Sequence, residues 1–117
     1  MLANTITLTV NTVDKVLARI SESPKDGSNY LLKSATEKFQ MKIRHSTGSR
    51  GGVVLNRHNI YVEHTTFATA TEAEKYRSFS LTLSELEGTD PDTLEHLTSA
   101  VNTAFSTLFD DVIGGQQ

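Results

Sequence analysis

The chain has 117 residues, a net charge of −3 and no cysteine. This length suits one compact domain with a modest core, and the lack of cysteine excludes disulfides and thiol chemistry. Only 37% of the residues are hydrophobic and none is tryptophan, so we expect a partner subunit to complete a thin core. No apolar run approaches the roughly 20 residues that span a bilayer, and residues 1–10 lack the pattern of a signal peptide. We therefore expect a cytoplasmic protein without a membrane partner.

The charges are distributed unevenly along the chain. Residues 33–57 hold six lysines and arginines and one acid, whereas residues 83–117 hold seven acids and no lysine or arginine. Because local fields decide where a polyanion docks, the negative net charge does not exclude nucleic acid as a partner.

The first elements are predicted to be strands. Apolar residues alternate with threonines in residues 5–10 and alternate again in residues 15–21, on either side of the turn sequence NTVD. This pattern predicts an N-terminal β-hairpin over residues 5–21. Residues 21–29 are rich in turn formers and predict a loop, and residues 30–33 predict a short strand.

The next strand is predicted at residues 37–46. In KFQMKIRHS (residues 38–46), apolar side chains and His45 take one set of alternate positions, and cations and an amide take the other. Because side chains alternate across a strand, this pattern predicts a half-buried strand with a basic outer face. Residues 46–52 predict a turn, in which Gly51 and Gly52 can take positive φ.

Two more strands are predicted before the tail. Residues 53–64 alternate over most of their length, and residues 76–84 alternate between apolar residues and serines or threonine. The stretch between them, residues 65–74, is irregular and predicts a projecting loop.

The tail changes to a helical period. Asp90 can cap a helix that begins at Pro91, and Gly114 can end it. An apolar stripe at helical spacing consists of Leu94, Leu97, Val101, Phe105 and Leu108. The segment is predicted to be one helix, or two with a break near Phe105.

These elements predict a single α+β domain over residues 1–117. It would contain the hairpin (5–21), an antiparallel sheet of about five strands (29–84) and the helical segment (91–113). One helical segment covers only part of such a sheet, so we expect an intertwined dimer whose chains exchange helices and pack through the apolar stripe.

The polar face of this sheet is the main candidate site, and its side chains suit the binding of RNA. Cations meet phosphates, amides and hydroxyls contact base edges and the 2′-hydroxyl, and a tyrosine stacks on an unpaired base. Glu63 would accept from a base amino group or hold an arginine. The alternative is an ordinary solvated sheet face. The residues are Lys38, Gln40, Lys42, Arg44, Arg57, Asn59, Tyr61, Glu63, Tyr76, Ser78, Ser80 and Thr82.

Other chemistry receives little support. His58 and His64 are six residues apart, roughly 20 Å along a strand, and cannot share a metal ion. The acids around residues 85–92 suit a solvated loop and a helix cap. No nucleophile elbow or phosphate-binding loop is present. We therefore predict no catalytic residue, metal, cofactor or small-molecule substrate.

The segments KFQMKIRHS, NRHNIYVEH and EKYRSFSLTL, followed by a helical segment, resemble the coat proteins of single-stranded RNA bacteriophages (leviviruses). The resemblance covers most of the chain and rests on scattered residues and element order. It implies an N-terminal hairpin, a five-stranded sheet, two C-terminal helices and a dimer whose subunits lay helices over the partner's sheet. Such dimers assemble in the bacterial host cytoplasm into the icosahedral shell of the virion.

The resemblance also implies that the inner sheet face binds genomic RNA and a hairpin at the replicase start, which represses translation. Tyr76 is the implied stacking residue, and residues 66–74 match the loop around the shell's symmetry axes. Lys42 and Tyr61 depart from the residue types of the best-known members. RNA contacts are implied for Lys38, Gln40, Lys42, Arg44, Ser46, Arg57, Asn59, Tyr61, Glu63, Tyr76, Ser78, Ser80 and Thr82, with a register uncertain by two in the last strand.

The sequence leaves three alternative functions for this protein. The first is a self-assembling coat protein without catalytic activity, and the second is a dimeric RNA-binding regulator that forms no capsid. The third is a small enzyme with a polar pocket on the sheet, which we rank last because no acid, base and nucleophile converge. Assembly state separates the first two.

Overall fold

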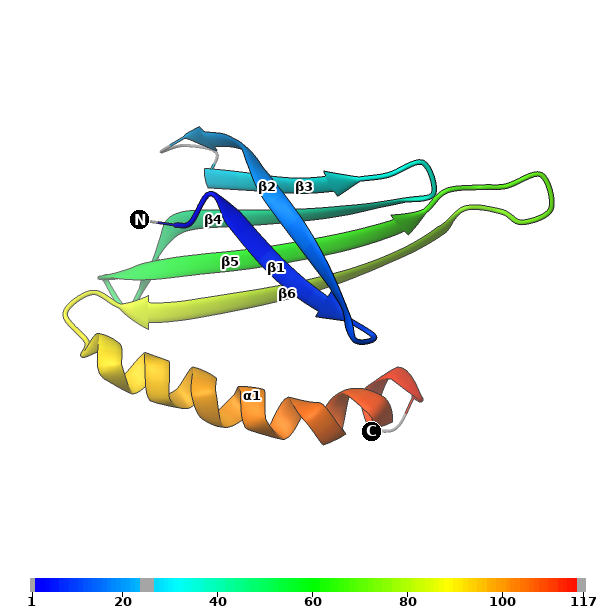
Figure 1. Ribbon diagram of the computed structural model, residues 1–117. Helices are drawn as coiled ribbons and strands as arrows, with labels where there is room; N and C mark the ends of the chain where they lie inside the picture. Colours follow the sequence, from blue (N-terminus) through cyan, green and yellow to red (C-terminus); the bar gives the residue numbers. More distant parts are fainter. Residues whose placement is uncertain (1, 24–26, 116–117) are drawn as a thin grey trace.

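The computed structural model describes residues 2–23 and 27–115. In these residues the chain forms one antiparallel sheet of six strands and one C-terminal helix (Figure 1). Each strand pairs with the next one along the chain, so spatial order equals sequence order. The elements are β1 (Thr5–Val10), β2 (Val13–Ser23), β3 (Gly27–Lys33), β4 (Glu37–Arg50), β5 (Val53–Thr66), β6 (Lys75–Leu86) and α1 (Pro91–Ile113).

The α+β prediction is confirmed, and the sheet has six strands where about five were expected. The N-terminal hairpin is continuous with the sheet because β2 pairs with β3, which raises the number of strands to six. Strand β2 runs to Ser23, β3 begins at Gly27 and β6 runs to Leu86, so part of the predicted loop at 21–29 is strand. The middle of that loop, residues 24–26, lies outside the described residues. The helix is continuous through Phe105.

The turn predicted at residues 46–52 is much shorter than expected. Strands β4 and β5 pair up to Arg50 and Val53, which leaves Gly51 and Gly52 as a two-residue turn. Both glycines have positive φ, 59° and 80°, as tight hairpin turns that match the strand twist require. The glycine content of the segment suggested a loop, whereas only the last two glycines are needed for the turn.

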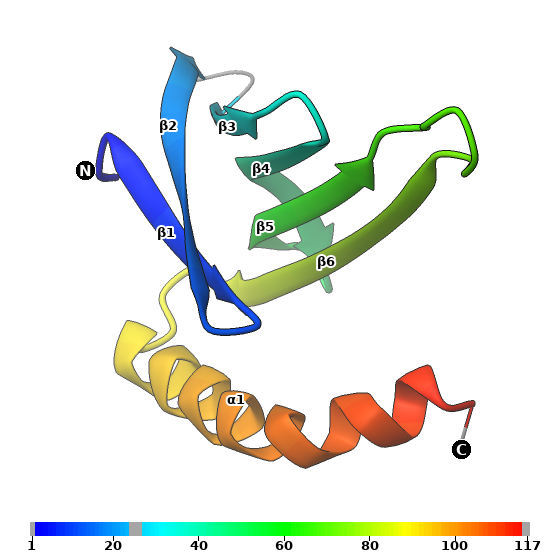
Figure 2. The same cartoon turned by 45° about the vertical axis from the view of Figure 1, so that its right-hand side comes forward.

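The core lies between the N-terminal hairpin and one face of the sheet. Strands β1 and β2 cross over that face (Figures 1 and 2), and the pairing of β2 shifts register between Arg19 and Ser21. Such an irregularity bends a strand. The hairpin thereby brings Leu17, which is fully buried, onto the sheet. The buried cluster consists of Leu17, Tyr30, Phe39, Met41 and Ile43.

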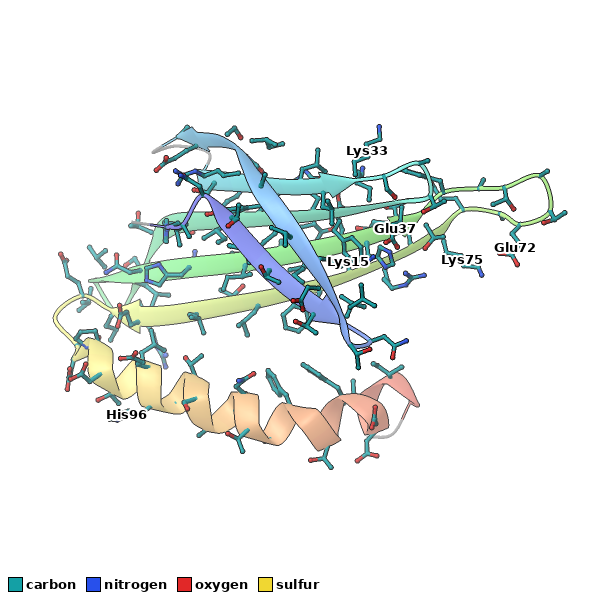
Figure 3. All side chains as sticks on the ribbon, in the orientation of Figure 1. Lys15, Lys33, Glu37, Glu72, Lys75 and His96 are labelled. Atoms are coloured by element: carbon teal, nitrogen blue, oxygen red, sulfur yellow. The ribbon has the colours of Figure 1, made fainter. Side chains whose placement is uncertain are left out.

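Polar contacts hold the hairpin on the sheet. Lys15 Nζ of β2 donates to Glu37 Oε1 at 2.9 Å, and His64 Nε2 is 2.9 Å from Glu37 Oε2. Figure 3 shows Lys15 beside Glu37. The His64 ring stacks on Phe39 with 4.1 Å between centroids. These contacts link β2, β4 and β5, and the hydrogen bonds from Lys15 and His64 lower the pKa of Glu37.

The helix lies beside β6 and leaves much of its apolar surface open. Asp90 caps it by accepting from the Asp92 backbone N–H at 3.0 Å, and Phe109 meets Phe79 of β6 edge-on at 5.9 Å between centroids. No helix in the described part of the chain is long and apolar enough to cross a membrane. Between helix and strand lies a groove of about 1040 Å³, whose lining includes Phe79, Leu81, Leu83, Leu94, Leu97 and Phe105.

Candidate nucleic-acid interface

Strands β4, β5 and β6 build the candidate site on the face opposite the core. Lys42 pairs with Tyr61, which pairs with Ser80, and Arg44 pairs with Asn59. Phe39, Met41 and Ile43 point the other way, into the core, because side chains alternate along a strand. The register therefore gathers all thirteen sequence-predicted side chains on one face, with Tyr76 opposite Thr65.

The sequence interpretation missed the contribution of β3 to this face. Asn29 pairs with Lys42, and Lys33 pairs with Lys38, so both share the polar side of the sheet. Asn29 lay in the predicted loop, and the two adjacent leucines that follow it obscure the alternation. Alternation from Gly27 places Asn29, Leu31 and Lys33 on one side of the strand. Only the pairing with β4 shows that this side belongs to the polar face.

A hollow of about 340 Å³ lies in the middle of the polar face. It presents two cations, one amide, one phenol and one carboxylate, from two adjacent strands. Lys42 Nζ is 6.0 Å from the centroid of the Tyr61 ring, which is within the range of a cation–π contact. This combination offers charge to phosphates and hydrogen bonds to bases. The lining residues are Lys42, Arg44, Asn59, Tyr61 and Glu63.

Neighbouring strands fix the Asn59 and Arg57 side chains. The Asn59 side-chain amide donates to Ser80 Oγ at 3.0 Å and to Thr82 Oγ1 at 3.1 Å, which ties it to β6. The Arg57 guanidinium lies over Gly48 of β4, where a Cβ atom would be 2.7 Å from Arg57 Nη2. Because Gly48 has no side chain, the Arg57 guanidinium can occupy the space above it.

Tyr61, Glu63 and Tyr76 form a hydrogen-bonded cluster at one end of the face. Glu63 Oε2 accepts from the Tyr61 hydroxyl at 3.2 Å and from the Tyr76 hydroxyl at 3.1 Å, and the two hydroxyls also contact each other. The contact with Tyr76, together with burial and the Glu63 carboxylate, raises the pKa of Tyr61 to about 12. The Tyr61 hydroxyl therefore keeps its proton at neutral pH.

The histidines lie on the other side of these strands. His45 Nδ1 and His58 Nδ1 are 2.8 Å apart, and His58 Nε2 is 3.8 Å from Glu85 Oε1. Within residues 2–23 and 27–115, no three histidine or acidic side chains are arranged to hold a metal ion. His45, His58 and His64 take the core side that the alternation predicted, and they contact each other or carboxylates.

Comparison with known proteins identifies the family. No curated protein matches the chain significantly. Among solved structures, the virus-like particle of bacteriophage ESE001 is similar with a TM-score of 0.43 and 14% identity, over 80% of this chain and 86% of that one. The model of the family described as phage phiCb5, coat protein, matches residues 3–86, which include all six strands. The match confirms the resemblance to phage coat proteins: the chain belongs to the phage phiCb5 coat protein family and is a structural protein of the virion, not an enzyme.

Proposed function

We propose that this coat protein is the major capsid protein, that it forms dimers which assemble into an icosahedral shell, and that its polar sheet face binds the phage RNA inside that shell. The observation that carries the proposal is the one-sided placement of the thirteen polar side chains. The hairpin covers the opposite face of the same strands. A face that a capsid protein keeps polar and basic is suited to its polyanionic cargo.

The chemistry of the face favours single-stranded RNA over an unspecific anion. Lys42 and Arg44 can neutralise phosphates, and their neighbours Asn59, Ser80 and Thr82 can hydrogen-bond to base edges or ribose hydroxyls. Tyr76 is 57% exposed, so its ring is available to an unpaired base. Cations, hydroxyls and an open aromatic ring together suit a single strand.

The proposed dimer would use the edge of β6 and the groove beside it. In the described residues β6 has only β5 as a neighbour, so its outer edge can pair with a second β6. Leu97 of α1 is 60% exposed and lines the groove. A second copy that pairs through β6 and lays its helix into the groove would bury this apolar surface, at about 25 cal/mol per Å².

We further propose that the same face binds an operator hairpin at the replicase start and represses translation, as the resemblance to leviviruses implies. The measurement is competition between that hairpin and a scrambled hairpin of equal length for the purified dimer. Equal affinities would restrict the function to packaging, because phosphate contacts alone do not distinguish sequences.

The first test is expression of the chain alone, followed by size-exclusion chromatography with absorbance read at 260 and 280 nm. A capsid protein should elute as large uniform particles with a strong 260 nm signal. A small dimer that binds RNA without forming particles would instead favour the alternative function, an RNA-binding regulator.

Binding at the polar face is tested with Lys42→Ala and Arg44→Ala dimers and a single-stranded oligonucleotide. Each loss of a phosphate contact should weaken binding and reduce the slope of log affinity against log salt by about 0.7. Lys75→Ala is the matched control, because Lys75 points to the other side of the sheet, close to Glu72 at 3.5 Å. An unchanged slope in both test variants would place the RNA elsewhere.

A further inference from the structure

Glu63 is the one carboxylate among the thirteen side chains of the proposed RNA face. An acid at this place repels phosphate, so a face selected only for RNA binding would not contain it. Its contacts indicate what it does there. One oxygen, Oε2, accepts from both Tyr61 and Tyr76, and hydrogen bonds to a charged acceptor are stronger than neutral ones.

The geometry of the two tyrosines shows why they need a holder. Tyr61 is opposite Ser80, whereas Tyr76 is opposite Thr65, so the two tyrosines are offset by four residues along the strands. At about 3.4 Å per residue this offset is roughly 14 Å. Because their hydroxyls nevertheless touch, both side chains must lean along the sheet toward each other instead of standing upright on it.

A ring that leans along the sheet can present a face to solvent, where a base can stack on it. The Tyr61 ring is partly covered, with Lys42 Nζ at 6.0 Å from its centroid. The Tyr76 ring is more open, with 57% of the residue exposed. Tyr76 also belongs to the edge strand β6, so the hydroxyl contacts to Tyr61 and Glu63 are its lateral support from β5.

We propose that Glu63 is a positioning residue: with the Tyr61 hydroxyl it holds the Tyr76 ring flat on the sheet as a stacking platform for an unpaired RNA base, and it does not itself contact RNA. This role rests on the proposed RNA-binding function of the face. The negative charge is retained because a carboxylate oxygen can accept from both phenols at once.

The sign of the effect of Glu63→Ala distinguishes this role from simple electrostatics. If Glu63 acts only by its charge, its removal should tighten binding of a polyanion and steepen the salt dependence. If it positions Tyr76, binding should weaken although a negative charge has gone. We expect a loss of about fivefold, the lower end of the cost of one stacked base.

The experiment uses the coat-protein dimer and a ten-nucleotide oligoadenylate that carries one 2-aminopurine, whose fluorescence falls on stacking. Affinity is measured by titration at several salt concentrations, with Glu74→Ala as a control that removes a charge outside the cluster. Glu63→Ala should bind more weakly and quench less, with an unchanged salt slope, and Glu63→Gln should recover part of the loss. Glu74→Ala should not reduce the quenching.

Tyr61→Phe is the second variant, because it removes one hydroxyl and leaves the charge and the ring. It should weaken binding by a similar factor, and the double variant Tyr61→Phe with Glu63→Ala should lose little more, since both changes release the same ring. This variant also decides the matter if Glu63→Ala does not fold.

Tighter or unchanged binding in both single variants would overturn the positioning role while leaving RNA binding intact. A wild-type dimer that does not bind the oligonucleotide would reject the proposed function of the face, and the role of Glu63 with it. Weaker binding accompanied by a changed salt slope would make Glu63 a charge that acts on the RNA directly, which also contradicts the proposal.

Discussion

Glu37 joins three strands because its two carboxylate oxygens accept from different elements. Oε1 accepts from Lys15 of β2 and Oε2 accepts from His64 of β5. These hydrogen bonds lower the pKa of Glu37 from its ordinary value of 4.5. A carboxyl whose pKa is lower in the folded state contributes stability above its unfolded pKa, and this contribution is lost as the pH falls through the folded pKa.

We therefore expect Glu37→Gln to lower the free energy of unfolding by about 1 kcal/mol at pH 7. The difference from wild type should shrink as the pH falls below 4.5 and wild-type Glu37 becomes protonated. The measurement is urea unfolding at a fixed protein concentration, at pH 7 and at several values below 4.5. Glu72→Gln is the control, because its partner Lys75 is 3.5 Å away at an exposed site, where ion pairs contribute little. A pH-independent difference would contradict this account.

The sequence predicts which residues form the polar face, because alternation alone assigns a strand residue to one side of the sheet. It could not predict which side chains touch. The cluster of Tyr61, Glu63 and Tyr76 depends on the register of β5 with β6 and on the lean of two side chains. Sequence reasoning accordingly expected Glu63 to meet a base or an arginine, whereas the structure places it between two phenols.

The strands in which apolar and polar residues alternate regularly, such as β4 and β6, are the easiest to predict from sequence. The docking of the N-terminal hairpin was not predicted, although the hairpin itself was. The register shift between Arg19 and Ser21 bends β2, and Asn11 and Thr12 both take positive φ in the hairpin turn. Asparagine tolerates such a conformation, whereas it is rare for a β-branched threonine, so the sequence does not predict it.

The helix provides the test of the proposed dimer. Leu97 is 60% exposed in the single chain, so Leu97→Asp should leave the isolated subunit folded but prevent the dimer, because association would bury a charge. Size-exclusion chromatography with light scattering measures the result. His96→Asp is the matched control: His96 is exposed, points away from the sheet (Figure 3) and does not line the groove. Dimers of normal stability in Leu97→Asp would show that the stripe is not the interface.

The chain places its polar face and its apolar groove on separate parts of the molecule. The polar face of β4, β5 and β6 is turned away from the hairpin, whereas the groove between β6 and α1 opens beside the apolar face. The helix region carries acids such as Asp92 and Glu95. The uneven charge noted in the sequence thus corresponds to two separate regions of the molecule, which can serve RNA binding and subunit contact independently.

This separation predicts that a variant can lose RNA from its particles and still assemble. The double variant Lys42→Ala with Arg44→Ala should still form particles, because neither residue lines the proposed dimer groove, but its particles should contain less RNA. The measurement is the ratio of absorbance at 260 and 280 nm in the particle peak, with the elution volume as the check on assembly. Leu97→Asp should have the complementary effect: it should form no particles, because it forms no dimers. If the double variant forms dimers but no particles, RNA bound to this face takes part in assembly, and the two surfaces are not independent.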